Sequence, residues 1–396
     1  MKRTLASLEG QPLEGLRAFV RVDFNVPLAA GRVADDARIR AAVPTIQWLR
    51  RRGSRVVLSS HLGRPKGQAK PEFSLEVIVP ALETALGVPV TWIPNPCTAD
   101  AVQVTKRLPR GGVALVENVR FWPGEEANDR EFAQQMALLG DFYVNDAFGA
   151  AHRAHATTAA ITEFLSPAVA GFLMAKELQY LAEALRDPAR PFVSVLGGAK
   201  ISGKIDVIDA LLGRVDRILI GGAMACTFYL AQGFEVGDSL VEPDKADLAT
   251  QLLERGGDKI MLPADVVIAR ELNASAQRRT TKPDRVEPGW RVGDIGSETV
   301  EQFGNVIAEA RTVVWNGPMG VFEVPPFDNG TVGIAQALAR ATAAGATTIV
   351  GGGDSAAAVS RAGLSDQVSH VSTGGGASLE LLEGKVLPGV AALDDV

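Results

Sequence analysis

The segment from Phe192 to Leu212 combines the residue types that bind phosphate. An apolar run is followed by two glycines, then by Lys200 and Lys204, and then by a helical stretch. Free N–H groups and the helix dipole favour an anion at a helix start, so we expect the two lysines to share a face there, beside a phosphate. The spacing also approaches a P-loop, except that Ile205 stands where a magnesium-binding Ser or Thr belongs. The segment therefore predicts a phosphate chemistry arranged differently from that of the P-loop.

Cationic side chains follow the apolar runs of the first half of the chain. They are Arg38, His61, Arg64, Arg120 and Arg153, with His152 or His155 as a further candidate. Guanidinium groups suit phosphate and carboxylate, so the set predicts a site for a small, multiply charged anion, although each arginine alone is more often a surface charge. Asp23 and Asn25 alternate around Phe24 and point the same way, so they either hydrogen-bond a hydroxyl or stabilise a turn.

Glycine-rich turns replace these cations in the second half. Gly351–Ser355 (GGGDS) follows an apolar run and precedes an Ala-rich helix. Asp354 in this turn either binds Mg²⁺, which prefers oxygen ligands, or caps the helix. Ser372–Glu380 forms another such turn, whose open N–H groups predict a second anion site. Glu323 either holds a ribose hydroxyl or is a solvated charge.

Alternating strands and helices must position these residues. Apolar runs of strand length occur at 16–22, 55–59, 113–116, 142–144, 192–196, 217–220, 259–262, 312–315 and 347–350. Helical stretches lie between them, among them 41–52, 129–139, 207–212 and 329–343. Several runs are almost uniformly apolar, which is typical of parallel strands covered on both faces. The pattern predicts an α/β fold with parallel sheets, in which ligands gather beyond the carboxyl ends of the strands.

A length of 396 residues favours two domains. Residues 169–187 carry apolar side chains, including Leu181 and Leu185, at roughly helical spacing. We expect one helix there that joins a domain of residues 1–168 to a domain of residues 188–383. The alternative is a packed helix inside a single domain.

Composition and charge narrow the classes of partner. The net charge of −6 argues against nucleic acid, although 20 basic residues face 17 acidic ones up to Ala168 and 20 face 29 afterwards. No apolar run is long enough to span a membrane, and no secretory leader is evident. The chain has only two cysteines, Cys97 and Cys226, so we expect reduced thiols and a cytoplasmic protein without a membrane partner.

Nine motifs, read in order, closely resemble the phosphoglycerate kinase family. They are RVDFNVP (21–27), DDARIRAAVPTI (35–46), SHLGRPKG (60–67), ENVRF (117–121), NDAFGAAHRAHA (145–156), GGAKISGKI (197–205), WNGPMGVFE (315–323), GGGDS (351–355) and STGGGASLELLEGK (372–385). The resemblance therefore covers essentially the whole chain. It implies two Rossmann-like three-layer α/β/α domains with mainly parallel sheets, joined by a helix across a hinged cleft, with the tail 384–396 packed back on the first domain.

The resemblance also implies the reaction, which is 1,3-bisphosphoglycerate and ADP giving 3-phosphoglycerate and ATP, with magnesium, in a cytoplasmic monomer. The residues that it implies for phosphoglycerate are Asp23, Phe24, Asn25, Arg38, His61, Leu62, Gly63, Arg64, Arg120 and Arg153. For the nucleotide they are Lys204, Glu323, Gly352, Gly353, Asp354 and Ser355, with Asp354 at the metal. Around the transferred phosphoryl group they are Arg38, Lys200, Gly374 and Gly375.

The chain departs from the family pattern at a few positions. The family usually has Thr at Ala150 and a polar residue at Gly203, and its WMGLDIGP is WRVGDIGS (290–297) here. The last change leaves open a nucleotide contact at Val292 or Gly293. Two other functions stay open from the residues alone. One is a magnesium-dependent phosphotransferase with another acceptor, and the other is a non-catalytic anion- or nucleotide-binding protein.

Overall fold

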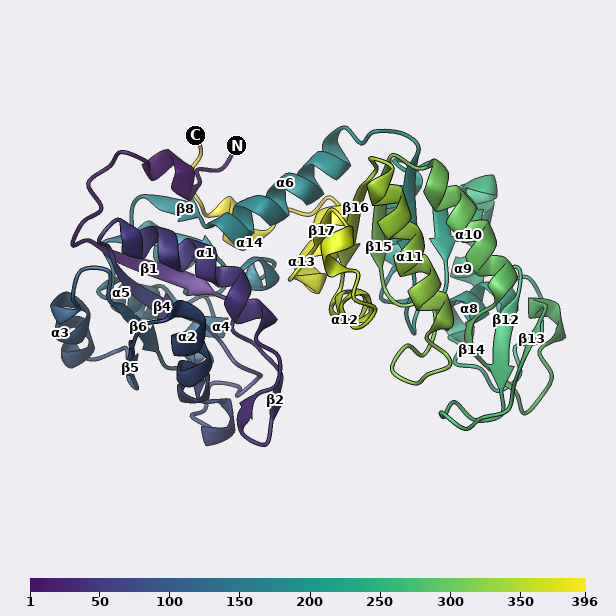
Figure 1. The fold of residues 1–396 in the computed structure, drawn as a ribbon, viewed down its shortest axis with the longest axis horizontal. Helices are drawn as coiled ribbons and strands as arrows, with labels where there is room; N and C mark the ends of the chain where they lie inside the picture. The colour runs from purple at the N-terminus through teal and green to yellow at the C-terminus, as the bar shows by residue number, and fades with distance from the viewer. The chain divides into compact units, whose positions relative to one another are not determined.

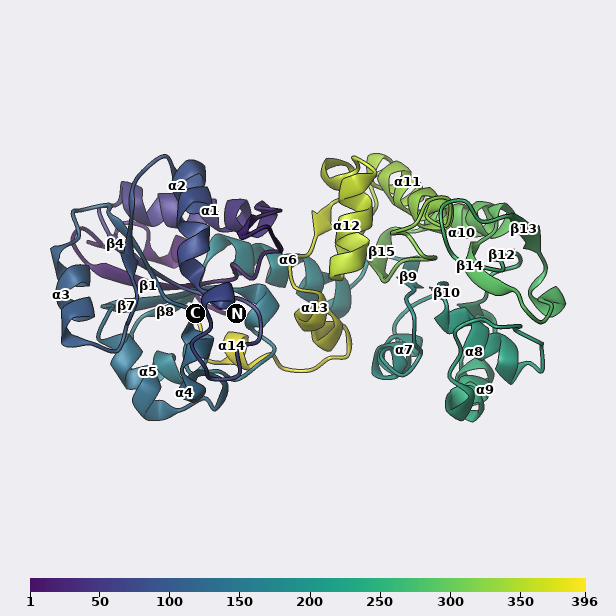
Figure 2. The ribbon, with the colours of Figure 1, turned by 90° about the horizontal axis from the view of Figure 1, so that it is seen from below.

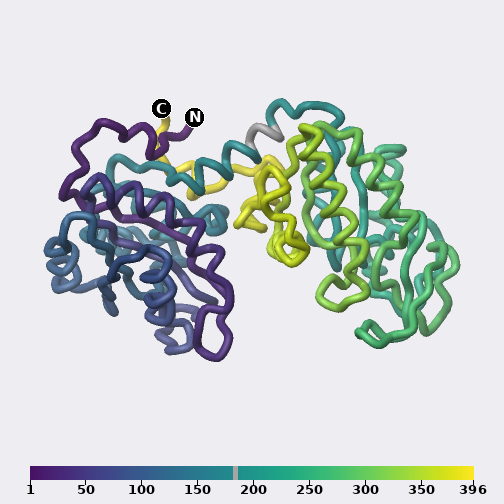
Figure 3. Tube along the Cα trace, in the orientation of Figure 1, coloured from purple at the N-terminus to yellow at the C-terminus, as the bar shows by residue number. Residues whose placement is uncertain are grey.

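The computed structural model describes the backbone of all 396 residues and the side chains of residues 1–181 and 186–396 (Figure 3). Leu185, one of the residues that predicted the joining helix, lies outside the described side chains. Contacts divide the chain into two compact units. Unit 1 comprises Met1–Gln179 and Val386–Val396, and unit 2 comprises Tyr180–Lys385.

Unit 1 is a three-layer α/β/α structure. Its strands are β1 (Arg17–Val22), β2 (Leu28–Ala29), β3 (Arg32–Val33), β4 (Arg55–Ser59), β5 (Val90–Ile93), β6 (Val113–Val116), β7 (Phe142–Asp146) and β8 (Ala168–Ala170). Its helices are α1 (Ala37–Arg51), α2 (Val79–Leu86), α3 (Ala99–Arg107), α4 (Pro123–Glu126), α5 (Arg130–Ala137), the first half of α6 (Phe172–Arg186) and α14 (Pro388–Ala391). Six strands form one sheet in the order β5-β6-β4-β1-β7-β8, and its five strand pairings are all parallel. Helices α1 and α2 cover one face and α4 and α5 the other (Figure 2).

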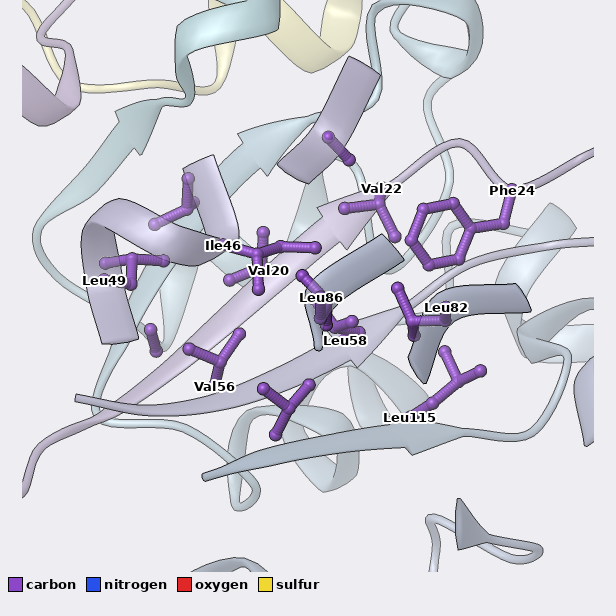
Figure 4. Packing of buried hydrophobic residues seen from close by; sticks show 14 of the residues in the cluster. Val20, Val22, Phe24, Ile46, Leu49, Val56, Leu58, Leu82, Leu86 and Leu115 are labelled. Carbon is purple, nitrogen blue, oxygen red and sulfur yellow. The ribbon is translucent and has the colours of Figure 1, made fainter. Parts of the chain in front are cut away.

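The core of unit 1 explains why these strands form a central sheet. Every residue of β1 is buried, as is every residue of β6. Val20 and Val22 of β1 pack with Ile46 and Leu49 of α1 (Figure 4). Since burial of such side chains stabilises the fold by about 1.5–3 kcal/mol each, the apolar runs must lie between two helical layers.

Unit 2 repeats this plan and adds a small antiparallel sheet (Figure 1). Its strands are β9 (Phe192–Leu196), β10 (Arg217–Ile220), β11 (Ile260–Met261), β12 (Val266–Ala269), β13 (Arg278–Thr281), β14 (Arg291–Ile295), β15 (Thr312–Asn316), β16 (Thr347–Gly351) and β17 (His370–Val371). Its helices are α7 (Ile205–Leu212), α8 (Met224–Ala231), α9 (Ala246–Gly256), α10 (Ser297–Glu309), α11 (Asn329–Ala343), α12 (Gly353–Arg361) and α13 (Gly375–Leu382), and it includes the second half of α6. The parallel sheet has the order β11-β10-β9-β15-β16-β17, and the antiparallel sheet the order β13-β12-β14.

The predicted α/β fold with mainly parallel sheets is confirmed in both units. Two local predictions are wrong. The joining helix begins at Phe172 and not at residue 169, because Ala168–Ala170 pair with β7 as strand β8. Helix α1 begins at Ala37, four residues before the predicted start, and contains Pro44.

The two ends of the chain lie together in unit 1. The Arg3 amide donates to the Asp394 carbonyl (2.8 Å), and Lys2 pairs with Asp395 (3.2 Å). The Asn145 side chain donates to the Gly389 carbonyl (3.0 Å). Backbone and side-chain contacts of the tail 386–396 are thus directed to unit 1. No helix among the described residues has the length and apolar character needed to cross a bilayer.

Candidate active site

Most of the predicted anion-binding residues of unit 1 follow the carboxyl ends of adjacent parallel strands. Asp23 follows β1, His61 follows β4, and Arg120 follows β6 by way of a short 3₁₀ turn. Because β6, β4 and β1 are neighbours in the sheet, these three chain segments leave the same edge side by side. The order of the strands thus assembles a site from residues about 100 positions apart in sequence.

Hydrogen bonds tie the first strand end to the second. The Arg38 guanidinium donates from Nη1 to Asp23 Oδ2 (2.8 Å), and Arg38 stands in the first turn of α1. The Asn25 amide N–H donates to Asp23 Oδ1 (3.2 Å), and the Gly63 N–H donates to Asn25 Oδ1 (2.9 Å). Asp23 and Asn25 therefore stabilise the turn, which is one of the two roles that the sequence allowed, and Asp23 also holds a cation beside it. The bond to a hydroxyl stays a prediction.

Arg120 is a buried cation, and His61 is a buried side chain that would become a cation if it were protonated. Arg120 donates from Nη1 to the Gly63 carbonyl (2.9 Å), and burial lowers the pKa of its guanidinium to about 10. Burial, reinforced by Arg21, Arg120 and Arg38, holds the pKa of His61 well below its ordinary value. His61 is therefore neutral at neutral pH, and the positive charge of this edge comes from guanidinium groups.

The other residues of unit 1 that the sequence predicted for the site differ in how exposed their side chains are. Arg64 and Arg153 are exposed, and Arg153 Nε lies 3.1 Å from His152 Nε2. The Phe24 ring lies in the hydrophobic core (Figure 4) and the Leu62 side chain is also buried, so neither side chain faces a ligand. The Phe24 N–H donates to the Ser60 hydroxyl (2.8 Å), and the Leu62 carbonyl accepts from the Asn118 side chain (2.7 Å). Gly63 has a φ of +61° and lies against the ring of Phe73, so a side chain there would be strained.

Sequence reasoning missed a buried acid–base group behind this edge. Arg21 in β1, Glu125 in α4 and Thr157 are all fully buried, and Arg21 Nη2 lies 3.8 Å from Glu125 Oε1. The sequence holds one signal of it, which is an arginine inside the apolar run of β1. His155, considered as a substrate ligand, belongs to this group, since its Nδ1 lies 3.9 Å from Glu125 Oε1. Burial lowers the pKa of His155 to about 3.

Unit 2 contains a cavity of about 580 Å³ beyond the ends of its parallel strands. It is lined by Gly198, Ala199, Gly222, Ala223, Ala225, Asp238–Val241, Pro263, Val266, Leu272, Arg291–Ile295, Pro318–Val321, Glu323 and Asp354. Most of these side chains are small or apolar, and the polar ones include two carboxylates proposed from sequence, Glu323 and Asp354. Such a lining fits a flat organic group with a charged end.

Glycine backbones packed directly on one another form part of this lining. The Gly198 N–H donates to the Pro318 carbonyl (2.9 Å), and the Gly222 N–H donates to the Met319 carbonyl (2.9 Å). A Cβ added to Gly222, whose φ is +68°, would lie 2.5 Å from the Gly198 nitrogen. Only glycine permits this approach, and it leaves backbone groups close to a ligand.

The two lysines occupy different positions from those predicted. Helix α7 begins at Ile205, with Lys204 at the position that caps it, whereas Lys200 is exposed and lies before an intervening turn. The expectation that both share a helical face is therefore wrong, because the turn at 201–204 breaks the helical spacing. Lys204 Nζ donates to Asn316 Oδ1 at the end of β15. Burial lowers the pKa of Lys204 to about 8, against the opposing effect of Asp354 and Glu383.

The two glycine turns near the carboxyl end of the chain touch each other. Gly352 precedes α12 and Gly374 precedes α13, and a Cβ on Gly375 would lie 2.9 Å from the Gly352 Cα. Gly353 and Asp354 are exposed in the first turn of α12. Ser355 is buried, and its hydroxyl accepts the Gly317 N–H (2.7 Å). Ser355 thus braces the strand end. The Gly374 N–H donates to the Ser372 hydroxyl (3.2 Å), so the N–H groups left for an anion are those that follow at the helix starts, at Gly353, Asp354 and Gly375.

Asp294 is a second residue of the cavity that sequence reasoning missed. It is buried, and its carboxylate accepts the Gly330 N–H (2.7 Å) and the Ile295 N–H (2.9 Å). Burial raises its pKa to about 8. Through its bond to the Gly330 N–H, Asp294 fixes one end of the 317–330 segment, which contains Glu323. Val292 and Gly293, the departures noted in the sequence, both line the cavity, so the changed motif still contributes to its wall.

Three comparisons with known proteins indicate the same family. The family model described as "Phosphoglycerate kinase" matches residues 8–385. The chain is 54% identical over 398 residues to "Phosphoglycerate kinase" of Synechococcus elongatus, covering 100% of this chain and 99% of that one. It is 57% identical over 390 residues to "Phosphoglycerate kinase" of Chloroflexus aurantiacus, covering 96% of each. The solved structure of phosphoglycerate kinase from Coxiella burnetii superposes with a TM-score of 0.86 at 41% identity, covering 97% of each chain.

Proposed function

Because the chain belongs to the phosphoglycerate kinase family, we propose a division of that family's reaction between its two units. The enzyme transfers a phosphoryl group reversibly from the carboxyl group of 1,3-bisphosphoglycerate to ADP, giving 3-phosphoglycerate and ATP, a step of glycolysis. The observation that supports this division is the chemical difference between the two units. Unit 1 gathers guanidinium groups at its strand ends, and unit 2 offers backbone amides, a lysine and a lined cavity.

In this proposal unit 1 binds phosphoglycerate. Arg38, Arg64, Arg120 and Arg153 supply the charge for the phosphate and carboxylate, because guanidinium pairs with both through two parallel hydrogen bonds. Asp23 and Asn25 hydrogen-bond the hydroxyl, and His61 donates one further hydrogen bond. The backbone of Phe24, Leu62 and Gly63 shapes the site, because its hydrogen bonds fix the side chains of Ser60, Asn118, Asn25 and Arg120 around it. The 2.8 Å pair between Arg38 and Asp23 supports this assignment, because it holds Arg38 at the edge before substrate arrives.

Unit 2 binds the nucleotide in the proposal. The cavity takes the base and sugar, with Glu323 on a ribose hydroxyl, and Lys204 takes a phosphate. The N–H groups of Gly352, Gly353 and Asp354 face the phosphates at the start of α12. Ser355 supports them through its bond to Gly317. Fixed N–H donors at a helix start suit phosphate, because they need no rearrangement to receive a negative charge.

Asp354 fits a magnesium ion carried by the nucleotide. The described residues contain no group of three or more His, Cys, Asp or Glu side chains placed to hold a metal by themselves. Mg²⁺ commonly binds through one or two carboxylates together with substrate phosphates, and Asp354 is exposed at the cavity beside Lys204. When bound, the ion would neutralise charge on the phosphate oxygens. We therefore propose Asp354 as its protein ligand.

Phosphoryl transfer needs positioning and charge neutralisation more than a protein nucleophile. We propose that Arg38, Lys200 and the amides of Gly374 and Gly375 surround the phosphoryl group while it passes in line from donor to acceptor. Substrates held on different units must be brought within bonding distance, so we propose that the units close by a hinge before transfer. Small-angle scattering should show compaction only with both substrates, and an unchanged radius of gyration would contradict the hinge.

We further propose that the enzyme works in the cytoplasm as a monomer. Two relatives, from Nicotiana tabacum and Triticum aestivum, are named "Phosphoglycerate kinase, cytosolic", and each is 52% identical to this chain. Light scattering of the purified protein should give the mass of one chain, 41.7 kDa. A mass of two or more chains would contradict the monomer.

The deciding assay measures ADP release from MgATP as a function of 3-phosphoglycerate. We expect saturable release that requires both the acceptor and magnesium. Release that another carboxylate or hydroxyl acceptor supports better would indicate a different phosphotransferase. Nucleotide binding without release would indicate a non-catalytic protein.

A further inference from the structure

A chain of buried polar groups lies directly behind His61. Arg21 Nη2 lies 3.2 Å from His61 Nδ1, and Arg21 Nε donates to the Thr157 hydroxyl (2.9 Å). The Thr157 hydroxyl in turn donates to Glu125 Oε1 (2.7 Å), and the Thr157 N–H donates to Glu125 Oε2 (2.9 Å). Arg21, Glu125 and Thr157 are wholly shielded from solvent, and His61 is 5% exposed. The four side chains therefore form one connected network, whose order is His61, Arg21, Thr157, Glu125.

The chemistry of arginine fixes the direction of the first bond. A guanidinium has five N–H donors and no acceptor, so His61 Nδ1 must accept. A neutral imidazole that accepts at Nδ1 carries its proton on Nε2. The ring nitrogen left for a ligand is then a donor, which is the polarity that a phosphate or carboxylate oxygen requires.

The same network fixes the orientation of Arg21. Its Nη1 donates to the Val22 carbonyl and its Nε to Thr157, and its Nη2 lies 3.8 Å from Glu125 Oε1. Burial raises the pKa of Glu125, and Arg21 opposes this rise. Thr157 fills two roles, because its hydroxyl accepts from Arg21 and donates to Glu125. A side chain without a hydroxyl at this position would remove the hydrogen-bond partner of Arg21 Nε and the donor to Glu125 Oε1.

Surrounding charges also oppose protonation of His61. Burial is the main cause that holds the pKa of His61 well below its usual range, and the charges of Arg21, Arg120 and Arg38 add to it. Glu125, the carboxylate of the network, is separated from His61 by Arg21. The direction of these effects agrees with the hydrogen-bond geometry, since both leave His61 neutral.

We propose that Arg21, held by Thr157 and Glu125, is a positioning residue that fixes His61 in the tautomer with its proton on Nε2. His61 then serves the anion site as a neutral hydrogen-bond donor at all pH values near neutrality. It neither adds a positive charge below pH 6.5 nor exchanges protons with the substrate. This inference rests on the proposed place of His61 in the phosphoglycerate site.

Nitrogen NMR of the histidine rings tests the tautomer directly. The chain has four histidines, so ¹⁵N-histidine labelling of the whole enzyme gives few signals, and a His61→Asn variant assigns those of His61. We expect His61 to show a protonated Nε2 and an unprotonated Nδ1, unchanged from pH 8 to pH 6. A proton on Nδ1, or a titration in this range, would overturn the proposal.

A matched pair of variants tests the role of Thr157. Thr157→Ser keeps the hydroxyl, and Thr157→Val keeps the shape and removes it. We expect the Val variant to populate both tautomers of His61 and to raise the KM for 3-phosphoglycerate on the order of tenfold, as expected for a lost bond to a charged group. The Ser variant should resemble the unmodified enzyme in both respects. A pure His61 Nε2–H signal in a folded Val variant would overturn the role of Thr157.

The kinetics of His61→Asn separate this inference from the proposed function. If His61 contacts phosphoglycerate, His61→Asn raises the KM for 3-phosphoglycerate and leaves the KM for MgATP unchanged. An unchanged KM for 3-phosphoglycerate would remove His61 from the site. The tautomer measurement on the enzyme without ligand would still decide whether Arg21 fixes the ring.

Discussion

The two proposed anion sites rely on different physical means, although both lie at the carboxyl ends of parallel strands. Unit 1 uses charged side chains, such as Arg38, which pairs with Asp23, and Arg120, which donates to the Gly63 carbonyl. Unit 2 uses the backbone, since glycines let three loops pack against one another and the first N–H groups of α12 have no partner within the helix.

The difference predicts which substitutions damage each unit. In unit 1, removing a side chain removes charge from the site, and a shorter or differently shaped cation does not replace a guanidinium. In unit 2, adding a single methyl group does the damage, because neighbouring backbone atoms occupy its place. Truncations in one unit and glycine substitutions in the other therefore test the comparison.

The largest effect is expected for Arg38→Ala. This change removes a guanidinium that we place beside the transferred phosphoryl group, so kcat should fall on the order of 10²-fold or more, equivalent to about 2.7 kcal/mol in the barrier. Steady-state kinetics measure it. Arg40→Ala is the matched control, because Arg40 is exposed on the same helix and pairs with Asp36. Equal turnover in the two variants would remove Arg38 from catalysis.

The next largest effect is expected for Gly222→Ala. The new Cβ would lie 2.5 Å from the Gly198 nitrogen and 2.9 Å from the Pro318 oxygen, at a φ of +68°. We expect a loss of stability of about 1–3 kcal/mol by overpacking and a higher KM for ATP. Urea denaturation and kinetics measure these. Gly213→Ala is the control, since its Cβ would meet nothing within 4 Å. Equal stability of the two variants would contradict the close-packed backbone.

Affinity for the nucleotide should weaken as the pH rises through about 8, the pKa to which burial lowers Lys204. Below this pH Lys204 is charged and attracts phosphate, and above it the group is neutral. We expect the dissociation constant for ATP to rise roughly tenfold per pH unit above the pKa, because one proton is needed for binding. Calorimetry measures it, and Lys204→Arg should flatten the profile. A flat profile in the unmodified protein would contradict the assignment.

The smallest effect is expected for Arg153→Ala. Arg153 is exposed, so its charge is screened by solvent, and we expect the KM for 3-phosphoglycerate to rise about threefold to tenfold with little change in stability. Arg110→Ala, which removes another exposed arginine of unit 1, is the control. An effect confined to the KM for ATP would contradict the division of substrates between the units.

Several features followed from the sequence because they depend on local spacing. The alternation of apolar runs and helical stretches predicts the parallel α/β units, and α11 has the predicted bounds. Glycine turns next to strands and helices predict open N–H groups, because glycine is needed wherever backbones approach closely. The nine sequence motifs indicate the family, and the family indicates the reaction.

Other features depend on contacts between distant segments and could not be read along the chain. The sequence alone determined which residues carry charge and where strands end in glycine or arginine. Only the tertiary structure decided that Lys204 bonds Asn316 and lies apart from Lys200, and that Ala168–Ala170 extend the sheet. It alone joined Arg21 to Glu125 and Thr157 behind His61, because burial makes such groups pair with whatever partner the fold brings within reach.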